Sequence, residues 1–198
     1  MTIKRSSGTV LDTTSLASTT RTQIDLAGID RVSVQVVYSD DAPAAKTFTD
    51  ADINNADDEI TITAHPYVTG TKVALTTDGG LPTGLSATNY WVIVVDANTI
   101  KLASSLANAV AGTAVATADD GSGTHTLTAA TSAGNTAKLQ VSNDGTNWTD
   151  LGSYSVTIAT TAGSTTWDVG AVSARYLAVL YTPSAGQVSL AIHAGYVI

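Results

Sequence analysis

Apolar and polar residues alternate along several short stretches of the chain, and this two-residue period predicts β-strands. In Arg31–Tyr38 the alternation places Val32, Val34 and Val36 on one face of a strand, with polar residues between them. Gly, Pro or Ser residues separate the stretches, as expected of turns. Short strands at this spacing are typical of a sandwich or a closed barrel. Six further strands are predicted outside the middle of the chain, at Thr22–Leu26, Ala137–Val141, Tyr154–Ile158, Thr166–Val169, Arg175–Tyr181 and Gln187–Ile192.

The middle of the chain holds a second group of predicted strands, bounded on both sides by small residues. Asp41–Ala45 precedes the group and Ala129–Gly134 follows it. A short helix is predicted at Ser104–Val110, because Ala111-Gly112 supplies a stop signal directly after it. The strands predicted in this part are Glu59–Thr63, Lys72–Thr76, Tyr90–Val95, Thr99–Ala103 and Thr124–Thr128.

These boundaries predict that a small β domain interrupts a β-sandwich. Residues 21–45 and 131–198 would form the sandwich, and residues 46–130 the inserted domain. Insertions are tolerated at exposed loop tips of small polar residues, which fits both boundaries. The alternative is two consecutive domains divided near Ala130. We favour the insertion, so the predicted fold class is all-β, a jelly-roll-like β-sandwich with a small inserted β domain.

Residues 1–20 show no regular alternation, although apolar residues occur at intervals. Ten of these twenty residues are Ser or Thr. Fully extended, the segment would span on the order of 65 Å. Two interpretations stay open: an extended N-terminal arm that orders against a neighbouring subunit, or a floppy terminus.

Composition supports the all-β class and divides the chain by charge. Of the 17 acidic residues only Glu59 is Glu, and the residue types that favour helices are scarce. The absence of Cys excludes disulfides, thiolate metal sites and a cysteine nucleophile. Residues 46–130 hold three Lys against nine acidic residues, whereas the rest of the chain holds six basic against eight acidic residues. The acidity therefore belongs to the inserted domain, and the nearly neutral sandwich is expected to contact a partner.

Residues that carry catalysis or bind metals do not form a recognisable pattern. His65, His125 and His193 share no ligand spacing, and no Gly-x-Ser-x-Gly elbow occurs. Asp119-Asp120-Gly121 suits either a calcium loop or a solvated turn, and we favour the turn. We therefore expect no enzyme, no cofactor and no metal site. An enzyme would require a histidine to converge with a carboxylate in a cleft.

Charge and hydropathy disfavour two classes of partner. The net charge is −8 and the nine Lys and Arg residues are scattered, so a nucleic-acid partner is not expected. The chain has neither a basic amphipathic helix nor a lipidation motif, so a membrane partner is not expected either.

Two stretches resemble proteins of tailed-bacteriophage particles. The C-terminal third, with Leu139–Leu151, Trp167 and Ala174–Val179, resembles small β-sandwich proteins of these particles. Within Ala64–Ala103, the sequence looks like a module of phage virion proteins. The resemblance implies a structural virion protein, of the capsid decoration or cement type or associated with the tail. Its implied partners are the major capsid protein or other virion proteins.

The motif around residue 144 is also similar to discoidin-like sugar-binding domains. In those domains the aspartate turn and the tryptophan are structural, and ligand contacts lie in other loops, so we carry over no binding residue. From the residues alone, Asp144 and Gly145 close a hairpin, and Trp148 and Leu151 can both pack inward across an irregular strand. Trp148 is predicted to be a core residue or an anchor of the hairpin. Arg175 caps or pairs with an acidic loop. A sugar-stacking role for Trp148 is the less favoured alternative.

Three functional hypotheses follow. The leading one is a capsid decoration or cement protein that binds assembled coat subunits as a homo-oligomer, with a trimer favoured and residues 46–130 facing solvent. A tail or head-fibre component is its close alternative. The second hypothesis is a carbohydrate-binding module for host attachment, with Trp91, Tyr90 and Tyr67 as exposed sugar contacts. The third is an enzyme, for which no residue is assigned.

Overall fold

The computed structural model describes residues 5–184 and 186–197 of the chain, which form two compact units. The chain leaves unit 1 after Asp40 and re-enters it at Ser132. Unit 1 is therefore discontinuous in sequence, with unit 2 lying between its two main segments. Unit 2 begins five residues earlier and ends one residue later than the insertion expected at residues 46–130. Unit 1 consists of residues 5–40, 132–184 and 188–197, and unit 2 of residues 41–131, 186 and 187.

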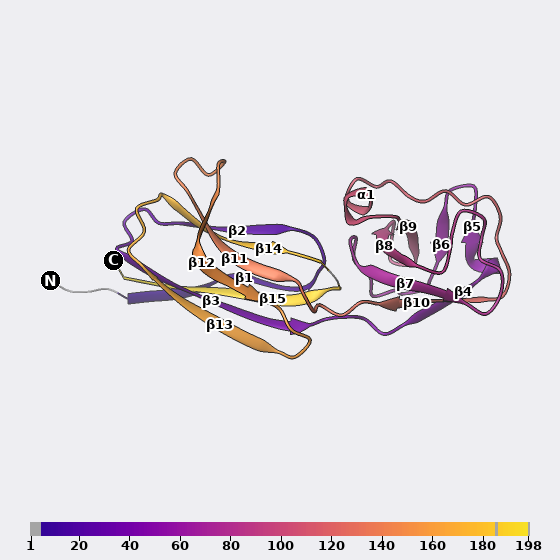
Figure 1. Cartoon of the computed structure of the whole chain (residues 1–198), viewed down its shortest axis with the longest axis horizontal. Coiled ribbons are helices and arrows are strands. Elements are labelled where there is room, and N and C mark those ends of the chain that lie inside the picture. The colour runs from indigo at the N-terminus through magenta and orange to yellow at the C-terminus, as the bar shows by residue number, and fades with distance from the viewer. Residues whose placement is uncertain (1–4, 185, 198) are drawn as a thin grey trace. The chain divides into compact units, whose positions relative to one another are not determined.

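Unit 1 contains eight strands in two four-stranded sheets, and every pair of neighbouring strands is antiparallel (Figure 1). Sheet A has the order β1-β15-β3-β13, and sheet B the order β12-β11-β14-β2. The strands are β1 (Arg5–Leu16), β2 (Thr20–Asp25), β3 (Arg31–Asp40), β11 (Thr136–Ser142), β12 (Thr149–Thr157), β13 (Gly163–Gly170), β14 (Tyr176–Thr182) and β15 (Val188–Val197).

The strand order of unit 1 is that of a jelly roll. Counted along unit 1 alone, the first, eighth, third and sixth strands form sheet A, and the fifth, fourth, seventh and second form sheet B. Two four-stranded sheets linked in this way make the eight-stranded double Greek key called a jelly roll. The predicted fold class, an all-β jelly-roll-like sandwich with a β insertion, is confirmed.

The core of unit 1 lies between the two sheets. Val32, Val34 and Val36 of β3 are at most 2% exposed, as their alternation predicted. They belong to one apolar cluster with Leu177 and Val179 of β14, which are fully buried. Burying an aliphatic side chain of this size contributes about 1.5–3 kcal/mol, so this cluster stabilises the pairing of the sheets.

The prediction of an N-terminal arm separate from the sandwich is wrong for residues 5–16. These residues form β1, an edge strand of sheet A that pairs with β15 from Arg5↔Val197 to Leu16↔Val188. Its partly buried apolar residues Val10, Leu11 and Leu16 pack against the core of unit 1. The register shifts twice along β1, and each irregularity breaks the two-residue period by which a strand is recognised. Residues 1–4 of the expected arm lie outside the described residues.

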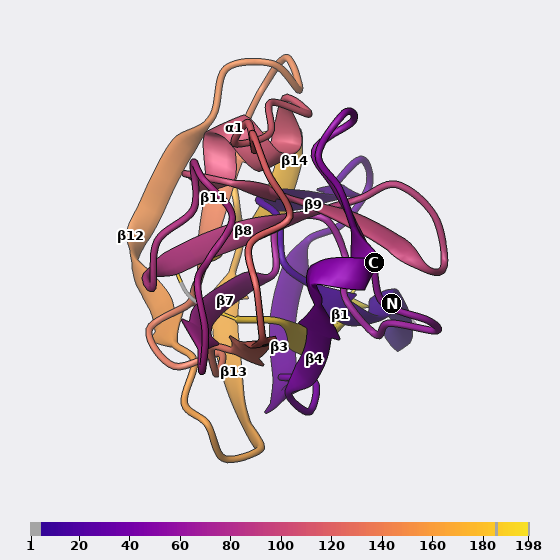
Figure 2. The ribbon, with the colours of Figure 1, turned by 90° about the vertical axis from the view of Figure 1, so that its right-hand side faces the viewer.

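Unit 2 is a seven-stranded antiparallel sheet that curls on itself (Figure 2). Its order is β4-β10-β7-β8-β9-β6-β5, yet the edge strands β4 and β5 are joined by only three residues, the 3₁₀ turn η1. Such a short connection brings the two edges together. The elements are β4 (Lys46–Thr49), η1 (Asp50–Asp52), β5 (Ile53–Asn54), β6 (Glu59–Thr61), β7 (Lys72–Thr77), β8 (Asn89–Val94), β9 (Thr99–Ala103), α1 (Leu106–Val110) and β10 (Thr124–Ala129).

Helix α1 lies within the range that its sequence predicts. Ser105 caps its N-terminus by accepting a hydrogen bond of 3.1 Å from the Asn108 amide. Gly112, at φ +72°, follows the C-cap residue Ala111. The single buried residue of α1, Ala109, belongs to a small apolar cluster with Ile93 and Ala103.

Residues 186 and 187 of unit 2 come from the connection between β14 and β15. Gln187, which is 1% exposed, hydrogen-bonds through its side chain to the fully buried Thr71 hydroxyl. The Gln187 carbonyl accepts a second hydrogen bond, of 3.2 Å, from the Asp41 amide. The sequence placed Gln187 at the start of a predicted strand of the sandwich, whereas the structure places it in the interior of unit 2.

Candidate functional site

The turn between β11 and β12 is organised around the carboxylate of Asp144. It accepts hydrogen bonds from the backbone amides of Asn147 (2.7 Å) and Thr146 (2.8 Å) and from the Asn147 side chain (2.7 Å). The Ser142 hydroxyl donates a further bond of 2.9 Å. These donors, Asn147 first, hold the pKa of Asp144 well below its usual range, because they favour the charged carboxylate. The hairpin role predicted for Asp144 matches this geometry.

Gly145 and Trp148 complete the same turn. Gly145 has φ +73°, a conformation that glycine adopts without steric cost. The Trp148 indole nitrogen donates to the Gly145 carbonyl over 3.2 Å, so the ring is fixed to its own turn. Trp148 is half-buried and lies outside the apolar core cluster, which Leu151 contacts. Of the two structural roles predicted for Trp148, core residue or hairpin anchor, the second fits this geometry, and Trp148 is not a core residue.

The Trp148 ring lies against Arg21, which begins a row of hydrogen-bonded polar side chains on sheet B. The Arg21 guanidinium carbon lies 5.1 Å from the centre of the Trp148 ring, a cation–π distance. Arg21 Nε donates to Gln140 Oε1 over 3.0 Å, and Gln140 Nε2 donates to Asp150 Oδ1 over 2.8 Å. Lys138 Nζ bonds the other Asp150 oxygen over 2.6 Å. We call these five residues, Arg21, Lys138, Gln140, Trp148 and Asp150, the sheet B patch.

The sheet B patch is preorganised for contact with another molecule. The bond to Lys138 and then that to Gln140 lower the pKa of Asp150, so this carboxylate stays charged. Arg21 is exposed, and its two Nη groups have no partner among the described residues. Tryptophan and arginine are enriched at the centres of protein interfaces, where a few residues carry most of the binding free energy. Chemically, the patch can stack an apolar group and bind a carboxylate.

Arg175 forms an ion pair at the end of the same sheet. Its Nε and Nη2 donate to the two carboxylate oxygens of Asp25 over 3.1 and 3.0 Å, a bidentate geometry. Hydrogen bonding to Asp25 raises the pKa of Arg175, and the pKa of Asp25 is lowered in return. Both side chains are about half exposed, so the pair contributes little to stability. The sequence predicts that Arg175 caps or pairs with an acidic loop, and in the structure its partner Asp25 is the last residue of β2.

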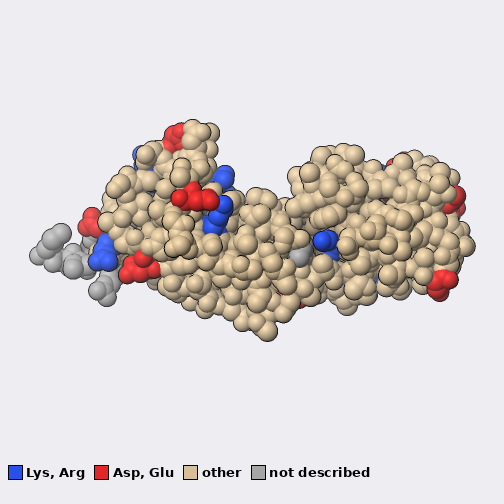
Figure 3. Space-filling view, viewed as in Figure 1, with Lys and Arg blue, Asp and Glu red and all other residues tan. Residues whose placement is uncertain are grey.

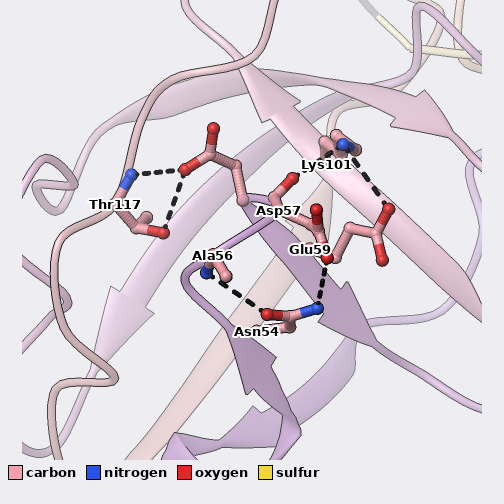
Figure 4. A network of polar contacts seen from close by, with 7 residues as sticks. Asn54, Ala56, Asp57, Glu59, Lys101 and Thr117 are labelled. Atoms are coloured by element: carbon pink, nitrogen blue, oxygen red, sulfur yellow. Dashed lines mark hydrogen bonds and ion pairs between the residues drawn. The ribbon is translucent and has the colours of Figure 1, made fainter.

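Three acidic residues of unit 2, Asp57, Asp58 and Glu59, take part in a local network between β5 and β6 (Figure 4). Lys101 Nζ donates to the Asp57 carbonyl over 2.7 Å and lies 3.4 Å from a Glu59 oxygen. Asp58, a non-glycine residue at φ +60°, accepts a 2.7 Å bond from the Thr117 amide. Figure 3 shows acidic side chains at separate points on both units. Unit 2 holds three Lys against ten acidic residues, whereas unit 1 holds six basic against seven acidic residues.

The loop with Asp119 and Asp120 is tied to its neighbours by hydrogen bonds. Asp119 accepts from the Thr83 amide (2.9 Å) and hydroxyl (2.5 Å), and these bonds lower its pKa. Asp120 accepts from the Asn55 side chain over 2.7 Å. Among residues 5–184 and 186–197, no group of three or more His, Cys, Asp or Glu is placed to hold a metal ion.

Two of the three predicted sugar-contact aromatics are buried, so that part of the prediction is wrong. Tyr67 is 4% exposed and Tyr90 is 5% exposed, and both belong to the core of unit 2. Burial raises the pKa of Tyr67 to about 12. Trp91 is half-buried, with Lys72 Nζ 5.3 Å from the centre of its ring. A ring must be exposed to stack on a sugar, so Trp91 alone retains an accessible face.

The three histidines bond hydroxyl or carbonyl groups rather than carboxylates. His193 Nδ1 lies 3.1 Å from the Thr9 hydroxyl, and His65 Nε2 lies 2.8 Å from the Asp96 carbonyl. His125 is fully buried, with its Nδ1 2.8 Å from the Thr77 hydroxyl.

Comparisons with known proteins leave the family open. No family model and no curated protein matches the chain. Two similar solved structures are the VP16-VP17 complex, a complex of the two major capsid proteins of bacteriophage P23-77, and VP17, a capsid protein of that phage. Each alignment covers 100% of both chains at 10% identity, with TM-scores of 0.25 and 0.23. Structural similarity at these TM-scores and this identity supports no conclusion about the fold or function of the chain. Within the described part of the chain, no helix is long and apolar enough to cross a membrane.

The residues around Trp148 show what sequence analysis missed. Asp144, Gly145 and Trp148 were singled out, but Arg21, Lys138, Gln140 and Asp150 were not. Lys138 and Gln140 alternate with the apolar Ala137, Leu139 and Val141 in a predicted strand, which marks them as outward-facing. In the structure Gln140 is 7% exposed. Nothing in the sequence indicates that Arg21, 127 positions before Trp148, lies beside its ring.

Proposed function

We propose that the protein is a structural component of a bacteriophage particle, a decoration or cement protein that binds assembled coat subunits. The observation that carries the proposal is the jelly-roll order of unit 1, with unit 2 inserted between β3 and β11. Jelly rolls form viral capsid domains and lectin domains. A fold hosts many functions, so the proposal also relies on the sequence resemblance to phage virion proteins and on the surface of unit 1.

The sheet B patch is the proposed contact with the coat. It combines an aromatic ring, an arginine with unused Nη donors and a hydrogen-bonded row that holds both in place. Unit 1 carries a net charge of about −1 and unit 2 of about −7. Desolvating charge opposes association, so the less charged unit makes the contact and unit 2 stays in solvent. The role is one of binding rather than catalysis.

A matched pair of tryptophan variants tests this contact. Purified chain is mixed with assembled coat-protein shells of the phage that encodes it, and the bound fraction is measured by co-sedimentation. Trp148→Ala is expected to weaken binding by about 30-fold, the effect of losing a hot spot worth roughly 2 kcal/mol. The control is Trp91→Ala in unit 2, because Trp91 is also half-buried and also contacts a basic side chain.

Each outcome has a separate meaning. The virion role is overturned if the unaltered chain does not sediment with shells and mass spectrometry does not detect it in purified particles. Equal binding by both variants overturns the sheet B patch as the contact. Cryo-electron microscopy of the particles decides between a capsid position and the alternative tail or head-fibre position, because it locates the protein directly.

A further inference from the structure

The outer face of sheet A differs from that of sheet B because its side chains are short. The residues between the buried positions of β3 point away from the core, and so do their cross-strand partners. Strand register arranges these residues in three rows that cross all four strands. The central row is Thr9, His193, Gln35 and Thr166; the second is Asp12, Ala191, Val37 and Ser164; the third is Ser7, Gly195, Ser33 and Asp168.

The central row separates two hollows. The first hollow is lined by all four residues of the second row, together with neighbours such as Ser39, Ser189 and Leu190. The second hollow is lined by Gly195, Ser33 and Asp168 of the third row, together with Arg31 and Tyr196. No residue of the central row lines either hollow. Gln35 and His193 are longer than most of their neighbours, so the central row is a ridge between two depressions.

We propose that this face binds a second copy of the chain, with the ridge of each copy in the first hollow of the other. A half-turn about an axis parallel to the rows, between the central and second rows, places His193 over Ala191 of the second copy. The same rotation returns His193 of the second copy to Ala191 of the first. The face is therefore complementary to itself, as an interface with two-fold symmetry requires.

Charge and area both favour a second copy as the occupant. The charged side chains among the twelve residues of the three rows are Asp12 and Asp168. The first hollow is lined by the apolar Val37, Leu190 and Ala191, and Asp12 is its one charged residue. The second hollow contains two charged residues, Arg31 and Asp168, so filling it would be more costly. Four strands about 4.8 Å apart and eight to twelve residues long cover about 600 Å² per copy. The pair would bury about 1,200 Å² in total, the lower limit for a stable interface.

Packing of sheet A against sheet A of a second copy would explain why the side chains on its outer face are short. Packed sheets approach to about 10 Å, and long charged side chains on the contact face would hold them apart. Val37, at 36% exposure, is one of the few large hydrophobic residues at the surface of the described chain, and the pairing would cover it. The inference concerns the isolated chain and does not rest on the virion role. It replaces the expected trimer with a two-fold pair.

Sedimentation velocity of the full chain across a concentration series tests the inference. The unaltered chain is expected to shift from monomer to dimer as concentration rises. Ala191→Arg and Ser164→Arg each place a long cation in the first hollow and are expected to weaken dimerisation by at least about tenfold. Gln23→Arg introduces the same side chain at an exposed outer-face position of sheet B and is expected to leave dimerisation unchanged.

Three results would overturn the proposal. They are a chain that stays monomeric at its highest soluble concentration, a trimer, and a dimer that persists in both hollow variants. Thermal unfolding of each variant verifies that it is folded. Because Ser164 is exposed and accommodates a longer side chain, Ser164→Arg decides the outcome if Ala191→Arg does not fold.

Discussion

Replacing Gly84 by Ala should destabilise unit 2 far more than replacing Gly112 by Ala. Both glycines lie in unit 2 and both have positive φ, +105° at Gly84 and +72° at Gly112. A Cβ atom at Gly112 would meet nothing within 4 Å. At Gly84 it would lie 2.0 Å from the carbonyl oxygen of Ala116, closer than non-bonded atoms approach. The pair therefore separates the effect of backbone conformation from that of a steric clash.

The magnitude follows from these two contributions. Backbone strain at a left-handed position costs about 1–2 kcal/mol for Ala, and this is the full effect expected at Gly112. At Gly84 the clash adds about 1–3 kcal/mol, because backbone on both sides must move apart. That movement also strains the bond of 3.1 Å from the Ala118 amide to the Thr83 carbonyl, worth about 1 kcal/mol. We expect a loss of roughly 3–5 kcal/mol for Gly84→Ala.

The assay must report unit 2 separately from unit 1, because the two units need not unfold together. Amide hydrogen exchange measured across a urea series does this, since protection of β7, β8 and β9 follows unit 2 alone. Both variants should leave the urea midpoint of unit 1 unchanged. If Gly84→Ala costs no more than Gly112→Ala, the close approach of the Gly84 loop to Ala116 does not constrain this position, and the reasoning is refuted.

Two further predictions concern single polar contacts. Asp144→Asn should destabilise unit 1 at neutral pH, because the native turn lowers the pKa of Asp144 and so favours folding wherever the carboxylate is charged. The difference in urea midpoint from the unaltered chain should shrink as the pH falls below about 4, the ordinary Asp pKa, because the unfolded carboxylate then takes up a proton while the native one, with its lowered pKa, stays charged; a pH-independent difference would contradict this account. Gln187→Ala should cost unit 2 about 2–3 kcal/mol, because it removes a buried partner of Thr71 and leaves a cavity. Hydrogen exchange of β7 measures this loss, and the exposed Gln23→Ala is the control, for which a change within about 0.5 kcal/mol is expected.

The sequence by itself determined the fold class and most strands of unit 1. Alternation at Val32, Val34 and Val36 reports which face is buried, because side chains of a strand point to opposite faces in turn. The turn at Asp144 and Gly145 was predictable for a similar reason, since its carboxylate bonds backbone amides two and three residues away. Information of this kind lies within a few residues, where one sequence is sufficient.

Strand β1 was missed because the local pattern fails there. Its register with β15 shifts between Thr9 and Leu11 and again between Thr13 and Leu16. Each irregularity changes the face on which the following residues lie, so the apolar residues of β1 reach the core without a constant period. The pairing with β15 joins opposite ends of the chain, and such pairing leaves no signal in the sequence of β1 alone.

Tertiary structure alone decided which surface residues meet and which aromatic residues are buried. Tyr67 and Tyr90 could have been exposed as far as their types show, but the closing of the unit 2 sheet places them in its core. Arg21 meets Trp148 because β2 and β11 both border β14, and Gln187 joins unit 2 through a connection between strands of unit 1. The physical reason is that burial and contact depend on strand order and register, and these are set by pairing between residues far apart in the chain.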